Sequence, residues 1–365
     1  MWQLQNKTPF PAEGYFIRDK AGTEHWAITL KATFTFDEKG RLTPAEVQEP
    51  LLKQQVFYGA PAQSSLRYDI ELLPERPATD VLLIGEAVAP QGQRVSSLEV
   101  GFSVGPISKR LQVTGDRVWK REWMKLVPSE PRPFKRMPLV WERAYGGVSA
   151  ELSGKLPTTG PELNPVGVGA YPSEREAEGK PLPNLEHPSH LLRSWLMTPP
   201  PWGVGPLSHM WPQRLRHGGT YDHQWQKERM PLLPLDFDPR YYQSAPEDQQ
   251  VPGYLKGGEK VELLHLTPTE RISFALPRLP LRFVSIFGAA HSPGEGRPHE
   301  AVLQQVRLEP SANKVVLIYY TQIECHQTLY RLRETRVWLE DPLLSSKTPQ
   351  PLGVPTEPSP RGGRA

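Results

Sequence analysis

The sequence has little cysteine, no long apolar run and almost no excess of charge of either sign. The single Cys325 cannot form an internal disulfide, so we expect a reducing cytoplasm as the location. No run of about 18 apolar residues occurs, and the first residues lack the basic start and apolar stretch of a secretory signal, so no membrane partner is expected. The formal net charge of +3, from 43 Lys and Arg against 40 Asp and Glu, argues against nucleic acid as a partner.

Proline and glycine are abundant instead. The 365 residues include 42 Pro and 29 Gly, which excludes a helical bundle, a coiled coil or a long-helix solenoid. The 10 Trp, 11 Phe and 12 Tyr are nevertheless enough to build a hydrophobic core. The composition therefore predicts a compact, loop-rich protein.

Period-two alternation is the clearest local pattern. It joins six apolar residues with intervening polar ones, namely Trp26, Ile28, Leu30, Ala32, Phe34 and Phe36 with Thr29, Lys31, Thr33 and Thr35. This pattern predicts a strand with one solvent-facing side. Shorter patterns predict further strands at 80–88, 98–104, 109–113, 117–119, 260–266, 270–276, 302–308 and 315–320. The fold class expected is therefore mainly β, with antiparallel sheets forming a sandwich or an open barrel.

The middle of the chain has a different composition. Pro and Gly recur every few residues there, and short helices are expected only at 188–197 and 220–229. A structureless insert of this length is improbable in a compact domain, so we interpret it as an ordered, aromatic-rich layer packed on the sheets. The expected organisation is an N-terminal antiparallel β region at 1–127, the loop layer at 128–252, a β region at 253–344 that completes the same core, and a disordered tail at 345–365.

Two short motifs suggest nucleophiles, but their contexts do not fit. The segment 101–105 matches the G-x-S-x-G elbow around Ser103, yet Pro106 follows and a strand continues, so a hairpin is the better interpretation. Cys325 and His326 are neighbours on an expected strand and would point to opposite faces. We therefore expect a buried, inert thiol and no catalytic residue.

Histidines and aspartates in the middle segment raise the possibility of a metal. Five of the ten histidines lie close together in sequence, at His187, His190, His209, His217 and His223. Their spacing matches no compact zinc motif, and Asp236-Phe237-Asp238 is too short a pattern to specify a divalent ion. The expectation is no metal and no cofactor, with turn and capping roles for these residues. The alternative is a metal-assisted hydrolase or transferase that uses Asp222, His223, Asp236 and Asp238.

One local charge bias stands out. Residues 105–145 contain ten Lys and Arg against four Asp and Glu, a local excess of +6. This segment is either a set of solvated hairpin faces or a surface that meets an acidic protein. The candidate partner-binding residues are Lys120, Arg121 and Lys125 in this segment, with Trp202, Trp211 and Trp225 as aromatic anchors in the proline-rich layer.

Several blocks of the sequence resemble a bacterial protein family. They are SLRY at 65–68, PATDVLLIG at 77–85, TGDRVW at 114–119, MPLVWERAYGG at 137–147, NPVG at 164–167, LPNLE at 182–186, GTYD at 219–222, LPLDFD at 233–238 and GGE at 257–259. Over roughly residues 5–310 the chain is similar to the domain-of-unknown-function family 2169.

The resemblance implies a role in type VI secretion. Its members are encoded near spike proteins and effectors, and some act as adaptors or chaperones that load an effector onto the spike. The partners implied are an effector with a PAAR-like tip domain and a VgrG-type spike protein. The family has no agreed catalytic residues, so the resemblance implies no enzyme activity, and the residues themselves suggest a binding scaffold.

Overall fold

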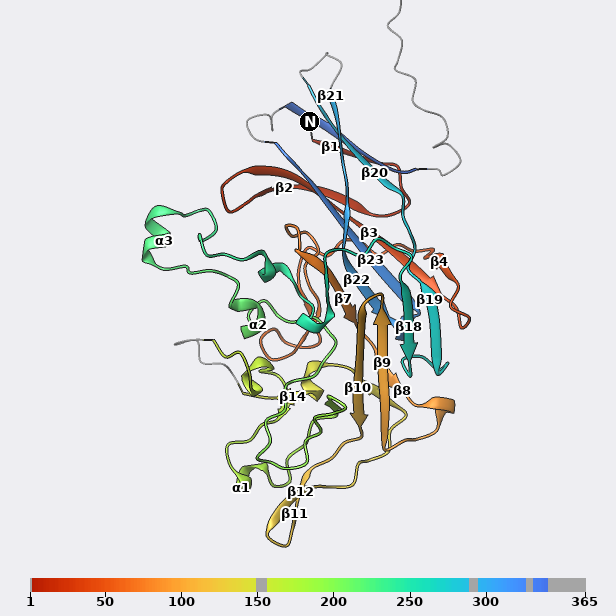
Figure 1. Ribbon diagram of the computed structural model, residues 1–365, viewed down its shortest axis with the longest axis vertical. Helices are drawn as coiled ribbons and strands as arrows, with labels where there is room; N and C mark the ends of the chain where they lie inside the picture. The colour runs from red at the N-terminus through yellow and green to blue at the C-terminus, as the bar shows by residue number, and fades with distance from the viewer. Residues whose placement is uncertain (1, 149–155, 289–294, 326–330, 341–365) are drawn as a thin grey trace, which may run out of the picture.

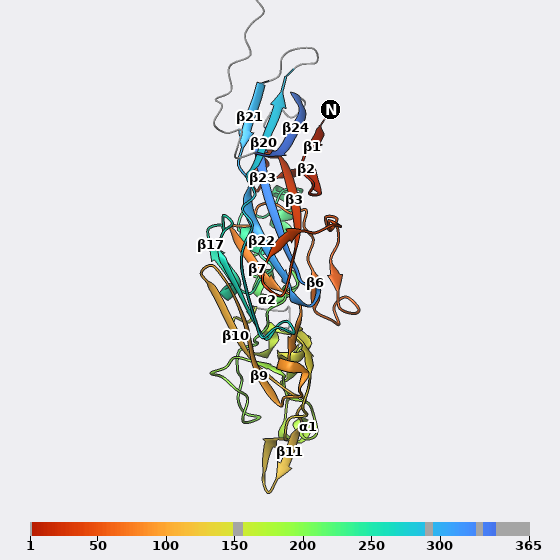
Figure 2. The same ribbon diagram turned by 90° about the vertical axis from the view of Figure 1, so that its right-hand side faces the viewer.

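The structure is a computed structural model that describes residues 2–148, 156–288, 295–325 and 331–340. It confirms the mainly β fold class, with open sheets and only short helices. Figures 1 and 2 show an elongated molecule. No helix in these ranges is long and apolar enough to cross a membrane. The tail expected at 345–365 lies outside the described residues.

A seven-stranded sheet forms the centre of the molecule. Its order is β17-β7-β22-β23-β3-β2, with β4 also paired to β3. The strands are β2 (Ala12–Arg18), β3 (Glu24–Phe36), β4 (Leu42–Pro44), β7 (Ala78–Leu83), β17 (Gln250–Pro252), β22 (Val302–Glu309) and β23 (Lys314–Glu324). The long strand β3 matches the predicted alternation. Strands β7 and β22 run parallel, which the expectation of purely antiparallel sheets did not include.

A five-stranded antiparallel sheet packs beside the central one. It consists of β9 (Ser97–Val104), β10 (Ile107–Thr114), β16 (Leu185–Glu186), β18 (Lys260–Leu264) and β19 (Arg271–Ala275). The two sheets share one hydrophobic cluster, in which Phe36 stacks on Phe274 with ring centroids 5.2 Å apart. Strands β9 and β10 form a hairpin that contains Ser103, so the G-x-S-x-G segment is confirmed as hairpin and not as a nucleophile elbow.

A four-stranded sheet lies at one end of the long axis (Figure 1). Its strands are β1 (Gln3–Asn6), β20 (Leu281–Phe287), β21 (Glu295–His299) and β24 (Leu332–Leu339). Strand β1 pairs with β24 in parallel. Trp26 of β3 joins this sheet to the central one, because its indole N–H donates to Thr335 Oγ1 at 2.9 Å.

The remaining elements are short. Four two-stranded ladders pair β5 (Val56–Phe57) with β6 (Leu66–Tyr68), β8 (Glu86–Val88) with β13 (Arg136–Pro138), β11 (Trp119–Glu122) with β12 (Lys125–Pro128), and β14 (Tyr145–Gly146) with β15 (Val168–Gly169). The α-helices are α1 (Glu174–Ala177), α2 (Pro212–Leu215) and α3 (His223–Glu228). The 3-10 turns are η1 (Pro90–Gly92), η2 (Trp141–Arg143), η3 (Pro161–Leu163), η4 (Pro239–Tyr242), η5 (Glu247–Gln249) and η6 (Pro310–Ala312).

Two local expectations need correction. Helix α3 lies inside the predicted 220–229, but residues 188–197 form turns and not a helix. The face of β3 expected to be wet is covered, and Lys31 is only 1% exposed. The chain before β7 supplies Glu71 and Glu49, whose carboxylates lie 2.9 Å and 3.4 Å from the Lys31 ammonium. Paired in this way, a lysine is buried without an uncompensated charge.

Candidate functional site

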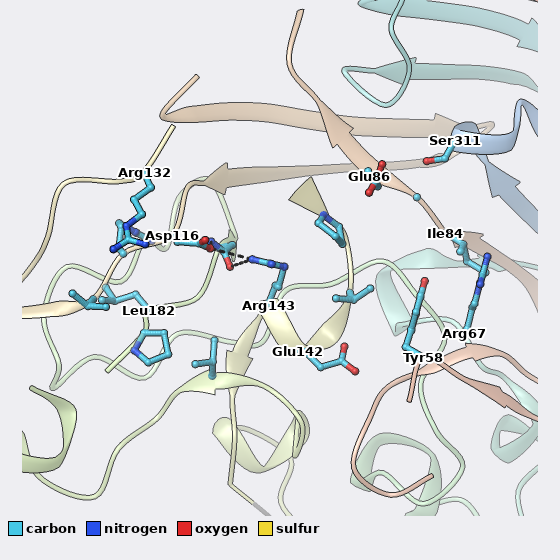
Figure 3. Close-up of a pocket in the computed structure, with 18 of the residues that line it drawn as sticks. Tyr58, Arg67, Ile84, Glu86, Asp116, Arg132, Glu142, Arg143, Leu182 and Ser311 are labelled. Atoms are coloured by element: carbon cyan, nitrogen blue, oxygen red, sulfur yellow. Dashed lines mark hydrogen bonds and ion pairs between the residues drawn. The ribbon is translucent and has the colours of Figure 1, made fainter. Parts of the chain in front are cut away.

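A cleft of about 1110 Å³ opens at one end of the central sheet (Figure 3). Strands β7 and β22 are parallel, so both finish at this edge. The residues that follow them line the cleft, including Ile84 and Gly85 after β7 and Ser311 in η6 after β22. The crevice outside the carboxyl ends of adjacent parallel strands is a usual place for ligands in open sheets.

The sequence blocks that carry the family resemblance form much of the cleft wall. Arg67, Asp116, Glu142, Val168 and Leu182 each come from or adjoin a different block, yet all of them line this one cleft. Most of the lining between the charged groups is apolar, from Ile84, Val118, Pro138, Val140, Val168, Pro181, Leu182 and Ala312. The fold therefore gathers distant segments into a single concave surface.

A hydrogen-bonded triad ties three of these segments together. Arg143 Nη1 lies 3.1 Å from Asp116 Oδ1 and donates to Asn184 Oδ1 at 2.8 Å, as Figure 3 shows for the first pair. Asn184 Nδ2 donates to the backbone oxygen of Thr114 at 2.9 Å. Asn184 Nδ2 also donates to Asp116 Oδ1 at 3.1 Å. Since each of the three side chains contacts the other two, the triad holds the middle of the wall in one conformation.

Two glutamates near the cleft bind other residues of the protein. Glu142 accepts hydrogen bonds from the backbone N–H and the hydroxyl of Ser65 at 2.6 Å and 2.7 Å. Glu186 pairs with Arg117 at 2.6 Å. Burial raises the pKa of the Glu186 carboxyl by more than the Arg117 charge lowers it. Both carboxylates act as structural acceptors.

The turn behind the wall depends on close backbone packing. Asn164 Nδ2 donates to the backbone oxygens of Trp141 and Tyr145 at 2.8 Å and 3.1 Å. Gly146 has φ of +151°, and a Cβ there would lie 2.2 Å from the Asn164 backbone oxygen. The paired glycines of this block are therefore required by space as well as by backbone conformation.

A second feature is the β11–β12 hairpin, which projects at the end of the long axis opposite the four-stranded sheet (Figures 1 and 2). Its two-residue turn consists of Trp123 and Met124, which are 99% and 90% exposed. Trp123 has φ of +54°, a conformation that is rare for a bulky residue outside a turn. This pair was not identified from the sequence, although an apolar dipeptide in a turn between two charged strands indicates an exposed apolar surface.

The base of the hairpin is anchored. Trp119 and Leu126 are buried in a small second core with Leu182 and Leu192. Arg121 pairs with Glu174 of α1 at 3.0 Å and with Glu178, which follows α1, at 2.9 Å. The buried side chains and the ion pairs therefore fix the base of the hairpin that carries the projecting turn.

The predicted basic residues lie on this hairpin. Lys120 is exposed and pairs with Glu122 on the same strand at 3.1 Å, whereas Lys125 is exposed at the start of β12. Some other cations of the segment are compensated too, and Lys109 is buried against Asp248 at 2.8 Å. Burial lowers the pKa of Lys109 to about 8, although Asp248 opposes the change. Much of the local positive charge is thus balanced within the fold.

The predicted tryptophans have structural contacts. Trp211 is 6% exposed and packs edge-on against Trp141, with ring centroids 5.7 Å apart. Trp202 is half-buried and donates to the backbone oxygen of Arg110 at 2.7 Å. Trp225 lies in α3, and its indole N–H donates to the backbone oxygen of Leu232 at 2.8 Å. The structure does not bring these three side chains together with the basic hairpin.

The histidine group is dispersed. His187 and His190 contact each other, with Nδ1 atoms 3.1 Å apart, while His209 lies against Gln55 and His217 lies 3.7 Å from Asp238. Within the described ranges, no group of three or more His, Cys, Asp or Glu side chains is placed to hold a metal ion. Cys325 is buried, as predicted for the thiol, and His326 lies outside the described residues.

The aspartates of the enzymatic alternative serve as local acceptors. Asp222 caps α3 through the Trp225 N–H at 2.8 Å, and His223 is exposed in the first turn. Asp236 accepts hydrogen bonds from the Thr220 N–H and hydroxyl. These bonds lower the pKa of its carboxyl, and the bond from the backbone N–H has the larger effect. Asp238 caps η4 and pairs with Arg240 at 2.6 Å.

Fold and surface together define a mainly β protein with an open apolar cleft and a projecting hydrophobic hairpin. The chain belongs to the DUF2169 family, described as uncharacterized proteins conserved in bacteria, whose model matches residues 21–320. No curated protein and no solved structure matches the chain.

Proposed function

We propose that this protein is an adaptor or chaperone that works in the bacterial cytoplasm. In this proposal it binds a type VI secretion effector with a PAAR-like tip domain and helps to load it onto the spike protein. The sequence blocks that resemble the family supply the biological setting. The observation that carries the proposal is the nearly complete exposure of Trp123 and Met124 on a braced, projecting turn.

Exposed apolar side chains of this size favour a binding role. Leaving an indole in water forgoes the burial energy of a large aromatic side chain, and tryptophan is the residue most enriched in interface hot spots. The hairpin base is fixed by Trp119 and by the α1 ion pairs, so little conformational entropy is lost when the turn docks. This geometry suits a protein that contacts its partner through the end of a projecting hairpin.

The same observations give less support to the hydrolase or transferase alternative. Asp222, Asp236 and Asp238 each accept hydrogen bonds from neighbouring backbone groups. Such bonds fix the carboxylates in turns and caps, where they satisfy loop N–H groups. We therefore favour the scaffold.

The test is affinity for the effector encoded beside this protein. Surface plasmon resonance with the full chain should show specific binding, and Trp123→Ala should weaken it about 30-fold or more, as loss of a hot-spot aromatic does. Leu235→Ala is the matched control, because Leu235 is 70% exposed but lies in the loop after α3. Its affinity should stay within about twofold of the parent, the scale of a surface change.

Two outcomes would count against the proposal. Absence of binding between the native chain and the effector would reject the adaptor role itself. Equal affinity of Trp123→Ala and the parent would remove the hairpin turn as the contact. The thermal unfolding of Trp123→Ala should match that of the parent, since the side chain is almost fully exposed.

A further inference from the structure

Two of the arginines that line the cleft are open to solvent. Arg67 and Arg132 are exposed and line the cleft, and Figure 3 places them at opposite ends of it. Arg67 lies over the rings of Tyr58 and Tyr68, with its guanidinium carbon 5.8 Å and 5.1 Å from their centroids. Among the ion pairs of the described ranges, neither guanidinium meets a carboxylate.

The acids of the same cleft are already occupied. Glu86 pairs with Arg136 at 3.2 Å, and Asp116 lies 3.1 Å from Arg143. Glu142 accepts two hydrogen bonds from Ser65, and Glu309 pairs with Arg307 at 2.6 Å. Three of the four acids are thus paired with cations, whereas Glu142 keeps its negative charge. Two arginines against this one carboxylate leave the cleft with a net positive charge, and the two arginines lie at its ends.

Between the two arginines the surface is apolar and large. Val118, Val140 and Val168 contribute to this part of the lining and are not fully buried. The volume of about 1110 Å³ exceeds the roughly 300 to 1,000 Å³ typical of small-molecule pockets. The Arg143 triad keeps the wall in place, so the surface is formed before a ligand arrives. These properties fit a chain segment better than a metabolite.

We propose that this cleft binds an extended acidic peptide segment of a partner protein. Apolar side chains of the segment pack on Val118 and Val140, and carboxylates near its two ends pair with Arg67 and Arg132. Guanidinium and carboxylate form bidentate, charge-assisted hydrogen bonds, which fix the register of the peptide in the cleft. The inference deepens the proposed function, since the effector is the natural carrier of such a segment.

Selection from a phage-displayed library of random 12-residue peptides tests the cleft without knowledge of the partner. The enriched peptides should carry two acidic positions that flank apolar residues. Their affinity, measured by fluorescence anisotropy with labelled synthetic copies, should fall about tenfold or more in the double variant Arg67→Glu/Arg132→Glu, because attraction becomes repulsion at both ends. It should also fall with added salt.

The control variant Lys39→Glu/Lys256→Glu makes the same change in net charge at exposed sites that do not line the cleft. It should bind the selected peptides as the parent does. A third variant, Val140→Trp, fills the apolar part without a charge change and should also lose binding. Circular dichroism of every variant checks that the fold is retained.

The inference is overturned if no peptide is enriched, if the enriched peptides lack acidic positions, or if the double arginine variant binds them unchanged. It is also overturned if a single-stranded oligonucleotide competes for the cleft more tightly than any selected peptide. The effector assay remains a separate arm. Effector binding that survives in Arg67→Glu/Arg132→Glu, together with a failed selection, would reject the cleft and leave the adaptor role standing.

Discussion

Single polar side chains hold the proline-rich layer on the sheets. Asp80 on β7 accepts from the Gln243 amide at 2.6 Å and from the Ser244 backbone N–H at 2.7 Å. Gln249 donates to the backbone oxygens of Val81 and Val204 at 2.7 Å and 3.0 Å. A segment rich in proline has few N–H groups for a strand ladder, so side-chain bonds replace the missing pairs.

Trp141 is a buried and closely packed aromatic residue of this layer. It is buried, its indole N–H donates to the Gly205 oxygen at 3.1 Å, and a Cβ on Gly203 would lie 2.8 Å from its ring. We expect Trp141→Ala to lower the free energy of unfolding by about 3 to 5 kcal/mol, as truncation of a core aromatic does. Urea denaturation measures the loss. A variant as stable as the parent would show that the ring does not support the layer.

His299 predicts a specific sensitivity to acid. Burial lowers its pKa to about 4, while its ring nitrogens contact the hydroxyls of Ser285 and Thr321 at 3.1 Å and 2.8 Å. The unfolded chain takes up this proton near pH 6.5, but the folded chain does so only near pH 4. Between these values the unfolded state binds more protons, so stability falls as the pH is lowered, by up to about 3 kcal/mol in total.

The variant His299→Gln isolates this contribution. Glutamine keeps a hydrogen-bonding side chain but does not titrate, so the part of the acid-induced loss due to His299 should disappear. Urea denaturation of both proteins at about pH 7 and about pH 4.5 gives the comparison. Parallel losses in the two proteins would show that His299 titrates normally.

At the scale of elements, a buried ion network joins strands of the central sheet to the chain that covers it. Arg307 on β22 bonds Glu71, Glu49 and Glu309 at 2.9 Å, 2.7 Å and 2.6 Å. Lys31 on β3 shares Glu71 and Glu49. Burial would lower the pKa of Arg307, but the surrounding glutamates raise it, so the guanidinium stays charged.

Removal of one charge from this network should cost far more than removal of a surface charge. We expect Glu71→Gln to destabilise by about 3 kcal/mol or more, because it leaves buried cations undercompensated. The control is Glu13→Gln, which breaks an exposed pair with Lys53 and should cost less than about 1 kcal/mol. Equal losses in the two variants, measured by urea denaturation, would contradict the structural role of the network.

The elements that the sequence predicted are those with a strong local pattern. Strand β3 carries an alternation over its whole length, and the β9–β10 hairpin has a glycine and a proline at its turn. Strand β24 reads Leu-Arg-Glu-Thr-Arg-Val-Trp-Leu, which has no period-two pattern, and it was not predicted. The burial of Lys31 was also missed, because it depends on Glu71, which is distant in sequence.

The candidate site was harder to predict than the fold. Residues of the cleft lie in separate blocks of the sequence, and nothing local indicates that Asp116, Arg143 and Asn184 meet. Their meeting depends on the tertiary fold, in which β10 pairs with β16 and so places the residues after β10 beside those before β16. The Trp123 turn, by contrast, is a local feature that strand and turn patterns are able to locate.

At the scale of the whole molecule, the hairpin turn lies at one end of the long axis (Figure 2), and Val118 and Ser129 at its base line the cleft. A partner that contacts the turn therefore also reaches the cleft. The same end carries the predicted basic residues. Arg121 pairs with Glu174 and Glu178, so its reversal would disturb the support of the hairpin as well as the charge.

Lys120 and Lys125 test the charge alone. Because Glu122 and the acids of α1 balance the cations nearby, we expect Lys120→Glu/Lys125→Glu to slow effector association only severalfold, and only at low salt. Trp123→Ala should instead raise the dissociation rate about tenfold or more, because the buried aromatic sets the residence time. Surface plasmon resonance at two salt concentrations separates the two rates. A charge reversal that abolishes association at high salt, with an unchanged dissociation rate for Trp123→Ala, would show that charge and not the apolar turn makes the contact.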